Sequence, residues 1–435
     1  MNNPNYIPKK SIEENMNIPQ GYKQTEFGPI PSDWGVCTFQ NVLTTFSSGA
    51  TPYRGIPEYY KGNVRWISSG ELNYNKIFDT IEHISQQAVR NTNLRVHQSG
   101  TFLMAITGLE AEGTRGRCAF VGAPATTNQS CLAINGTERM CTEYLFWFYR
   151  MWGQYLAFKY CQGTKQQSYT ANIVKNLPIY GPKDIAEQKA IAEALGDIDG
   201  LIAALDKKIA KKRLIKQGAM QQLLTGKKRL PGFSDPWVEK KFSDLYRYAS
   251  EGGTPDTNNM RFYANGDVPF VKIEDTETKY IESCNSFITS EGINNSSAWI
   301  VPVNSIIYTN GATIGNVSIN KIPVATKQGI LGIIPSSIIN LEFMYYLLLS
   351  QNFKREVDSR QAKGTFATII LKSLDEIPIY LPLNQMEQIA IATILSDMDK
   401  EIADLEAQRD KYRLLKSGMM QKLLTGQIRL KINRI

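Results

Sequence analysis

The residues of this chain that are most typical of a catalytic site are two acids and a lysine in its second half. Pro255-Asp256 is followed by Glu277-Thr278-Lys279, which matches the loose Pro-Asp and Glu-x-Lys pattern of many nucleases. In such a site the carboxylates hold Mg²⁺ and the lysine steadies the attacked phosphate. The chain contains an internal repeat that aligns these positions with Tyr53, Asn73 and Asn75, so the site would belong to one half only. We therefore favour a solvated loop, with a self-contained nuclease that uses Asp256, Glu277 and Lys279 as the alternative.

Other catalytic chemistry has little basis in the residues. The only histidines, His83 and His97, do not recur in the second half, which argues against metal sites and histidine acid–base catalysis. Gly226-Lys227-Lys228 lacks the upstream glycine of a P-loop, and no Gly-x-Gly-x-x-Gly follows a predicted strand. The six cysteines fall at irregular spacings and indicate free thiols in a reducing compartment. We predict no catalytic residue and no metal ligand.

Length and charge favour a large protein with a polyanionic partner. The chain has 435 residues, a formal net charge of +8 and a pI near 8.9, enough for two to four domains. Its first residues have no apolar core and no long apolar run follows, so we expect neither a signal peptide nor a membrane span, and a cytoplasmic location.

Polar and cationic loops recur at matching places in both halves. A Gly-x-Thr-Pro turn at residues 49–52 and again at 252–255 begins each of them. Arginine and lysine pair with guanine or phosphate, and asparagine and glutamine pair with adenine. Different side chains on a repeated scaffold would let one fold read two DNA sequences. The residues expected to contact DNA are Thr51, Tyr53, Arg54, Arg65, Arg115, Arg117, Lys165, Gln167, Tyr169, Thr254, Asn258, Asn259, Arg261, Lys327, Gln328, Lys363 and Thr365.

The elements that must position these loops form two α+β bodies of similar order. Strands are predicted at Val64–Ile67 and Val268–Val271, and again at 177–180 and 377–380. A helix with many aromatic residues is expected at 143–149 and at 342–348. Glycine, asparagine, serine and threonine punctuate the rest, as turns require.

A long helix closes each half. Residues 187–230 align without a gap on 387–430, and more than half of the aligned positions are identical. Apolar residues such as Ile191, Leu195 and Ile198 step by three and four, which is heptad spacing. The pattern predicts two helices of roughly 35–40 residues that pair antiparallel and hold the bodies at opposite ends of a rod. Helices packed only on their own domains are the alternative.

Taken together, these motifs resemble the specificity (S) subunit of type I restriction–modification systems. The order is Gly-x-Thr-Pro, strand, Gly-Thr, Pro-Ile-Tyr, then Glu-Gln-x-Ala-Ile-Ala on a helix that ends in Leu-Leu-Thr-Gly, all written twice over residues 25–430. The repeat and the resemblance divide the chain into five segments. They are an N-terminal lead (1–24), target recognition domain 1 (25–183), helical spacer 1 (184–230), target recognition domain 2 (231–383) and helical spacer 2 (384–435).

The resemblance implies a non-catalytic protein whose two domains each read half of a split double-stranded DNA site. The helices would set the spacing of the half-sites and dock two methyltransferase (M) subunits, and restriction (R) subunits would join the complex. S-adenosylmethionine, ATP and Mg²⁺ would be bound by these partners and not by this chain. A purely structural coiled-coil scaffold is a further alternative. The residues expected to contact a partner are Glu187, Gln188, Ile191, Leu195, Glu387, Gln388, Ile391 and Leu395.

Overall fold

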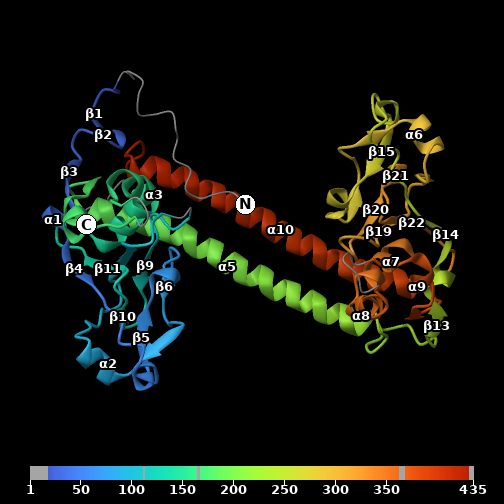
Figure 1. Ribbon diagram of the computed structural model, residues 1–435, viewed down its shortest axis with the longest axis horizontal. Helices are drawn as coiled ribbons and strands as arrows, with labels where there is room; N and C mark the ends of the chain where they lie inside the picture. Colours follow the sequence, from blue (N-terminus) through green and yellow to red (C-terminus); the bar gives the residue numbers. More distant parts are fainter. Residues whose placement is uncertain (1–17, 111–112, 164–166, 362–367, 431–435) are drawn as a thin grey trace. The chain divides into compact units, whose positions relative to one another are not determined.

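The computed structural model describes residues 18–110, 113–163, 167–361 and 368–430 (Figure 1). They divide into two compact units, which we call unit 1 (residues 1–204 with 408–435) and unit 2 (residues 205–407). Each unit therefore contains one body and parts of both long helices.

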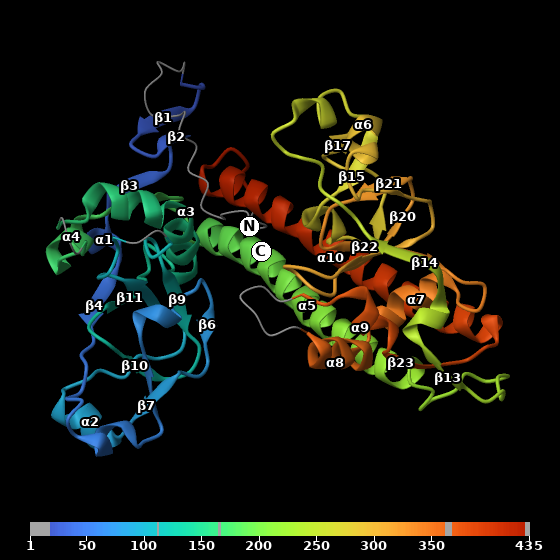
Figure 2. The same cartoon turned by 45° about the vertical axis from the view of Figure 1, so that its right-hand side comes forward.

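The centre of unit 1 is a five-stranded sheet in the order β4-β11-β8-β9-β6, in which only β6 and β9 run parallel. A smaller sheet, β10-β5-β7, joins β5 parallel to β10. Figure 2 shows the large sheet between α3 on one side and the small sheet with α2 on the other. The bounds are β4 Thr44–Ser48, β5 Val64–Ile67, β6 Lys76–Ile77, β7 Glu82–Ile84, α2 Gln86–Asn91, β8 Phe102–Ala105, β9 Cys118–Val121, β10 Ala125–Thr127, β11 Cys131–Asn135 and α3 Thr142–Tyr160.

Aromatic packing explains why α3 covers this sheet. All four residues of β8 and of β9 are buried, as expected for strands covered on both faces. Phe120 of β9 stacks on Phe146 of α3 with ring centroids 4.7 Å apart, and Phe102 of β8 meets Tyr149 edge-on at 5.6 Å.

The remaining strands and α-helices of the unit 1 body are β1 Tyr22–Thr25, β2 Gly28–Pro31, β3 Gly35–Thr38, α1 Phe39–Val42, α4 Ala171–Asn176 and β12 Pro178–Gly181.

Unit 2 repeats the strand order of the large sheet and nearly that of the small sheet. Its large sheet has the order β14-β22-β19-β20-β16, again with only the last pair parallel. Its small sheet, β17-β15-β21-β18, has one strand more, where unit 1 has an isolated bridge between His97 and Ala125. The bounds are β13 Val238–Lys241, β14 Tyr246–Glu251, β15 Val268–Val271, β16 Tyr280–Ile281, β17 Phe287–Ile288, α6 Ser290–Asn294, β18 Ile300–Val301, β19 Ile306–Thr309, β20 Val317–Asn320, β21 Val324–Thr326, β22 Ile330–Pro335, α7 Leu341–Leu348, α8 Gln351–Arg360, α9 Leu371–Asp375 and β23 Pro378–Leu381.

The predicted elements are confirmed. β5 and β15 have the expected bounds, α3 and α7 contain the expected aromatic helices, and β12 and β23 each begin and end one residue later than predicted. β1 begins at Tyr22, within the last residues assigned to the N-terminal lead, and pairs with β2 in a hairpin.

The long helices are α5 (Ile185–Leu223) and α10 (Gln385–Leu424). In unit 2, Lys212 of α5 forms a 2.7 Å ion pair with Glu401 of α10, and Lys216 pairs with Asp399, nearer the start of α10. In unit 1, Asp199 of α5 pairs with Lys416 of α10. The order of the partners in unit 2 confirms that the two helices run antiparallel.

The ends of both helices are part of the domain cores. The start of α5 places Ile191 and Leu195 in the core of unit 1, where the end of α10 adds Leu423 and Leu424. The core of unit 2 receives the start of α10 and Leu223-Leu224 in the same way. Leu205, Ile209, Ile402 and Leu405 form a separate seam between the helices. Both interpretations of the heptads, coiled-coil pairing and packing on a domain, therefore hold for different stretches.

Candidate nucleic-acid interface

The predicted DNA-contacting loops lie at one end of the strands of the large sheet in each unit. In unit 1 we call this group of loops loop edge 1. It consists of residues 49–55, 106–110 with 113–117, 128–130 and 167–170. They follow the ends of β4 and β8 or precede β9, β11 and α4. The backbone bonds Ala50 N to Thr127 O (3.2 Å) and Ile106 N to Ser130 O (2.9 Å) hold neighbouring segments together, and Leu109 N bonds Gln167 O (3.2 Å).

Loop edge 2 is built in the same way from residues 252–259, 310–316, 327–329 and 368–370 of unit 2. Asn310 N donates to Gly329 O (2.9 Å), and Ile369 N donates to Asn310 O (2.9 Å). Glu251 at the end of β14 accepts a 2.7 Å bond from Gly329 N. One backbone framework thus presents two sets of side chains.

The glycine that opens the Gly-x-Thr-Pro turn allows the turn to lie against the neighbouring strand. A Cβ on Gly49 would stand 1.8 Å from Thr127 O, and one on Gly252 would stand 1.9 Å from Thr326 O. Real atoms cannot approach so closely, so a side chain at either position would push the turn off β10 or β21. The repeated glycine therefore has a steric reason in each copy.

The proline of the turn is held by a tyrosine eight residues later in each unit. Tyr60 donates from its hydroxyl to Pro52 O at 2.6 Å, and Tyr263 donates to Pro255 O at 2.5 Å. Both turns are therefore fixed at their two ends, as a preorganised binding loop requires.

Two of the cations predicted in unit 1, Arg54 and Arg65, form ion pairs within the chain. Arg54 donates two bonds to Glu82 (2.6 and 2.8 Å) and lies over the Tyr60 ring at 4.3 Å. The Arg54 hydrogen bond lowers the pKa of Glu82 below its ordinary value. Arg65 Nε lies 3.4 Å from Asp79 Oδ1. Arg54 therefore lies in loop edge 1 but binds β7 of the small sheet through Glu82, whereas Arg65 belongs to β5 of the small sheet and lies outside loop edge 1.

Arg115 and Arg117 lie in loop edge 1. Arg115 Nη2 donates to Gln167 Oε1 at 3.0 Å, and Arg117 Nε donates to Gly113 O at 2.7 Å. The structure thus brings Arg115 and Gln167 together and leaves guanidinium donors of Arg117 for another partner. Thr51 and Tyr53 are exposed in the same edge.

In unit 2, Asn258, Arg261, Lys327 and Gln328 are exposed, and Thr254 is half-buried. Asn259 is half-buried because its side chain caps a short 3₁₀ turn and accepts a 3.2 Å bond from Arg261 N. Lys327 and Gln328 lie in loop edge 2, between β21 and β22.

One predicted contact is wrong. Tyr169 is only 4% exposed and belongs to the core of unit 1, so its ring cannot meet DNA on the surface. Lys165, Lys363 and Thr365 lie outside the described residues. The prediction also missed Gln129, an exposed residue of loop edge 1 that Thr51 contacts at 2.5 Å; its alignment with Gln328 was the available signal.

The nuclease alternative finds no support in the side-chain contacts. Lys279 pairs with Glu342 at 2.6 Å and donates to the Tyr346 hydroxyl at 3.1 Å. Its ammonium is therefore bound to α7, while Asp256 accepts bonds from Asn258 in its own loop. Within the described ranges, no group of three or more His, Cys, Asp or Glu side chains could hold a metal ion.

The eight residues predicted to contact a partner are all buried in their own unit, none more than 5% exposed. The prediction that these side chains meet another protein therefore needs correction. Gln188 accepts a bond from Cys141 N and donates to Arg139 O and Pro182 O. Gln388 does the same with Asn340 N, Ile338 O and Pro382 O. The repeated glutamine joins each helix start to its body.

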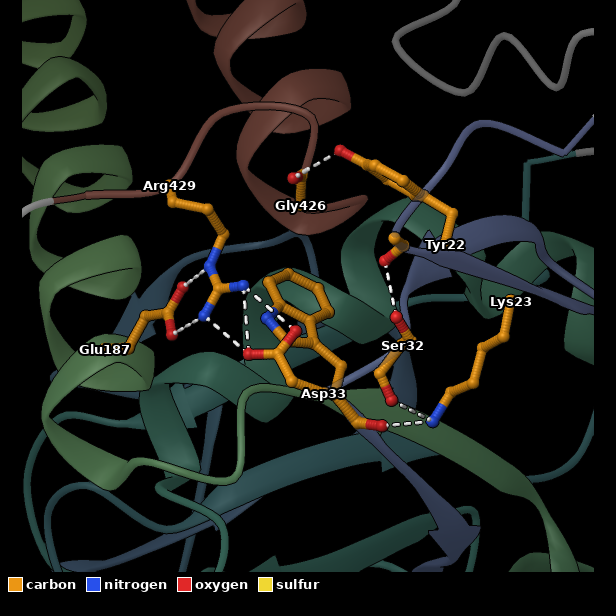
Figure 3. Close-up of polar contacts among 9 residues, drawn as sticks. Tyr22, Lys23, Ser32, Asp33, Glu187, Gly426 and Arg429 are labelled. Atoms are coloured by element: carbon orange, nitrogen blue, oxygen red, sulfur yellow. Dashed lines mark hydrogen bonds and ion pairs between the residues drawn. The ribbon is translucent and has the colours of Figure 1, made fainter.

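The repeated glutamate binds an arginine at the end of the other helix. Glu187 pairs with Arg429, which also reaches Asp33 at 3.1 Å (Figure 3). The Arg429 guanidinium lies over the Trp34 ring at 5.6 Å. In unit 2, Glu387 receives two bonds from Arg229 (2.7 and 2.8 Å), and Arg229 lies over Trp237 at 5.8 Å. The sequence signal for these pairs was the Arg-Leu that follows Leu-Leu-Thr-Gly in both copies.

The contacts around Arg429 shift the pKa values of two groups. The hydrogen bond from Arg429 lowers the pKa of Asp33, and the bonds to Glu187 and Asp33 raise the pKa of Arg429. His97, buried beside β10, has its pKa lowered to about 4, first by burial and then by the nearby Arg95.

No helix in the described part of the chain is long and apolar enough to cross a membrane.

Comparison with known proteins agrees with this architecture. The chain is 22% identical over 430 residues to the type I restriction enzyme MjaIX specificity subunit of Methanocaldococcus jannaschii, covering 94% of this chain and 96% of that one. The crystal structure of a type I restriction–modification S subunit from M. genitalium superposes with a TM-score of 0.58, at 15% identity, over 92% of this chain and 97% of that one. A second structure, from a study of complex assembly and conformational transition in the type I system, gives 0.53 at 16% identity, over 92% and 99%.

The family model for the type I restriction modification DNA specificity domain matches the chain twice, at residues 31–212 and 234–412. The two matches leave out little of the sequence, and the repeated topology of the two units agrees with them. The chain therefore belongs to the family of type I restriction–modification DNA specificity subunits, whose role is recognition and not catalysis.

Proposed function

We propose that this chain reads a bipartite DNA target, with loop edge 1 reading one half and loop edge 2 reading the other. The observation that carries the proposal is the repeated framework described above. The same backbone bonds, the same sterically required glycine and the same tyrosine–proline bond support two loop edges whose other side chains differ. A backbone framework that occurs twice in one chain, with different side chains in each copy, is suited to reading two DNA sequences.

The charge of the chain supports DNA as the ligand. A net charge of +8 favours a polyanionic ligand. Arg117 lies in loop edge 1, Lys327 lies in loop edge 2, and Arg261 follows the 252–259 segment of loop edge 2. Cations of this kind contact phosphates and guanine, whereas amides such as Gln328 match adenine. Binding should weaken steeply as the salt concentration rises, because phosphate contacts release counterions.

We further propose that two methyltransferase subunits dock on α5 and α10, that restriction subunits join them, and that the paired helices set the spacing of the half-sites. The buried Glu-Gln motifs leave the exposed residues of the helices for this role, among them Leu214 (69%) and Leu414 (74%), which hold equivalent positions in the repeat. The similar structure from a study of type I complex assembly supports such partners. S-adenosylmethionine, ATP and Mg²⁺ would be bound by these partners.

The test is selection from randomised DNA. The chain, purified with its methyltransferase partner, is incubated with duplexes that carry a randomised region, and the bound fraction is sequenced. We expect enrichment of two short defined sequences separated by a fixed number of unspecified base pairs. Enrichment of no sequence would refute the proposed function.

A further inference from the structure

A glutamine occupies the same place in both loop edges. Gln129 lies between β10 and β11, Gln328 lies between β21 and β22, and both are exposed. The neighbours of the two glutamines differ: Asn128 precedes the first and Lys327 precedes the second. The glutamine is thus retained where the flanking residue has changed.

Both glutamines stand on a backbone that is fixed on either side. The residue that precedes each glutamine donates its backbone N–H to a carbonyl of β5 or β15 in the small sheet. The carbonyl of that same preceding residue accepts a bond from the backbone N–H three positions later. The carbonyl of the residue after each glutamine accepts from the loop that follows β8 or β19. The bonds are Asn128 N–Ile67 O (2.9 Å), Cys131 N–Asn128 O (3.2 Å) and Ile106 N–Ser130 O (2.9 Å) in unit 1, and Lys327 N–Val271 O (3.1 Å), Ile330 N–Lys327 O (3.1 Å) and Asn310 N–Gly329 O (2.9 Å) in unit 2.

In unit 1 the side-chain amide is also oriented. Thr51 Oγ1 donates to Gln129 Oε1 at 2.5 Å, so the Nε2 end of the amide faces away from Thr51. The turn that carries Thr51 is itself held by the close approach of Gly49 and by the bond from Tyr60 to Pro52. In unit 1 the Gly-x-Thr-Pro motif therefore places Thr51 where it fixes the orientation of Gln129.

This geometry suits recognition of one base. A carboxamide that offers a donor and an acceptor side by side matches N7 and the N6 amino group of adenine in the major groove. Gln129 Oε1 has two lone pairs, so it can accept from Thr51 and from adenine together. Because Gln129 is oriented before DNA binds, it loses less side-chain conformational entropy on binding than a freely rotating surface glutamine would lose.

We propose that Gln129 and Gln328 each read one adenine, in the first and second half-site respectively, and that Thr51 is the positioning residue for Gln129. The inference rests on the proposed function and names the residues and the base class by which the two loop edges read. It also predicts that both half-sites contain an A·T pair, although their other bases differ.

The experiment compares variants of the full chain, each complexed with the methyltransferase partner, in the same selection from randomised DNA. Gln129→Met removes both hydrogen-bonding groups and should reduce discrimination at one A·T pair of one half-site by about 5- to 150-fold. Gln328→Met should do the same in the other half-site. Thr51→Val should weaken discrimination at the Gln129 position by a smaller factor, which identifies a role through the glutamine.

Gln129→Glu gives a gain-of-function readout. A carboxylate accepts from the amino group of cytosine, so the preferred base at this one position should change from adenine to cytosine. The matched control is Gln98→Met, an exposed glutamine in the loop before β8, at the other end of the same sheet. It should leave the selected target unchanged.

The possible outcomes separate the two claims. A wild-type target that is bipartite, together with Gln129→Met and Gln129→Glu variants that select the same target as the wild type, overturns this inference and leaves the proposed function intact. A wild-type chain that selects no bipartite target overturns the proposed function itself. If Gln129→Met bound no DNA, the Gln129→Glu result would decide, because that side chain keeps the size and shape of the native residue and still accepts hydrogen bonds.

Discussion

Arg429 donates a hydrogen bond of 2.7 Å from Nη2 to Oε2 of Glu187, a residue 242 positions earlier in the chain. Arg229 and Glu387 form the same pair in unit 2. The end of each long helix is thereby attached to the start of the other within one unit. This reciprocity gives a physical reason for the similarity of the two helical repeats, since each has to supply both the acid and the arginine.

The first prediction concerns the buried acid of unit 2. Glu387 is 0% exposed and its carboxylate is held by Arg229 and by Trp237 Nε1 at 3.3 Å. Arg229→Met would leave this charge buried without its ionic partner, which costs about 3–5 kcal/mol of unfolding free energy. Urea unfolding followed by tryptophan fluorescence measures the loss, and adding Glu387→Gln should recover part of it.

The matched control for that variant is Lys241→Met. Lys241 forms a 2.7 Å ion pair with Glu376 in the same unit, but both side chains are largely exposed. Exposed pairs contribute little, so this variant should unfold at nearly the wild-type urea concentration. Equal losses for the two variants would show that burial of Glu387 is not what makes its pair important.

The second prediction concerns the glycine of the recognition turn. Gly49→Ala should displace the turn from β10, at a cost of about 1–3 kcal/mol for the overpacking, and should abolish selection of the first half-site. Gly200→Ala is the control, because nothing lies within 4 Å of a Cβ placed on Gly200 in α5. That helical substitution should raise stability by about 0.8–1.0 kcal/mol. A Gly49→Ala chain with full stability and an unchanged target would contradict the steric explanation.

The third prediction is a pH dependence from His97. The pKa of this residue is about 4 in the folded chain and about 6.5 when it is unfolded. Between these values only the unfolded chain takes up the proton, so stability is highest above pH 6.5 and falls as the pH decreases towards 4. His97→Gln should remove about 1–2 kcal/mol of the loss between pH 7 and pH 5, measured as urea unfolding at both values. An identical loss in the variant would rule out His97 as the source.

The sequence could predict the elements but not the burial of its most repeated motif. Short apolar strands such as Val64–Ile67 and the heptad pattern after Glu187 depend on local periodicity, and these predictions were confirmed. Glu187 and Gln188 were expected to face a partner because they lie in the helices that are nearly identical in the two halves, where the resemblance implies that methyltransferase subunits dock. Their burial depends on Arg429 and on backbone groups of Arg139 and Pro182, contacts that no local pattern could reveal.

In the candidate site, too, the local motifs could be predicted from the sequence, whereas the contacts between distant residues could not. The Gly-x-Thr-Pro repeat led correctly to two related loops, and Thr51, Arg115 and Arg117 lie together in loop edge 1. Tyr169 was misplaced because a tyrosine beside polar residues reads as a surface residue, whereas its ring fills the core beside α3. Gln129, which we propose reads adenine, was missed because its orientation depends on the bond from Thr51, 78 residues earlier.

The central claim, that each unit reads its own half of the target, is tested most directly by altering one cation in each loop edge. Arg117→Gln in unit 1 and Lys327→Gln in unit 2 are each expressed with the methyltransferase partner, and the methylated sites are mapped across a genome that lacks other specificity subunits. We predict that each variant relaxes or changes the bases of one half-site, a different half for each variant, while the other half and the spacing stay as in the wild type. Changes in both half-sites from either single substitution would contradict the account.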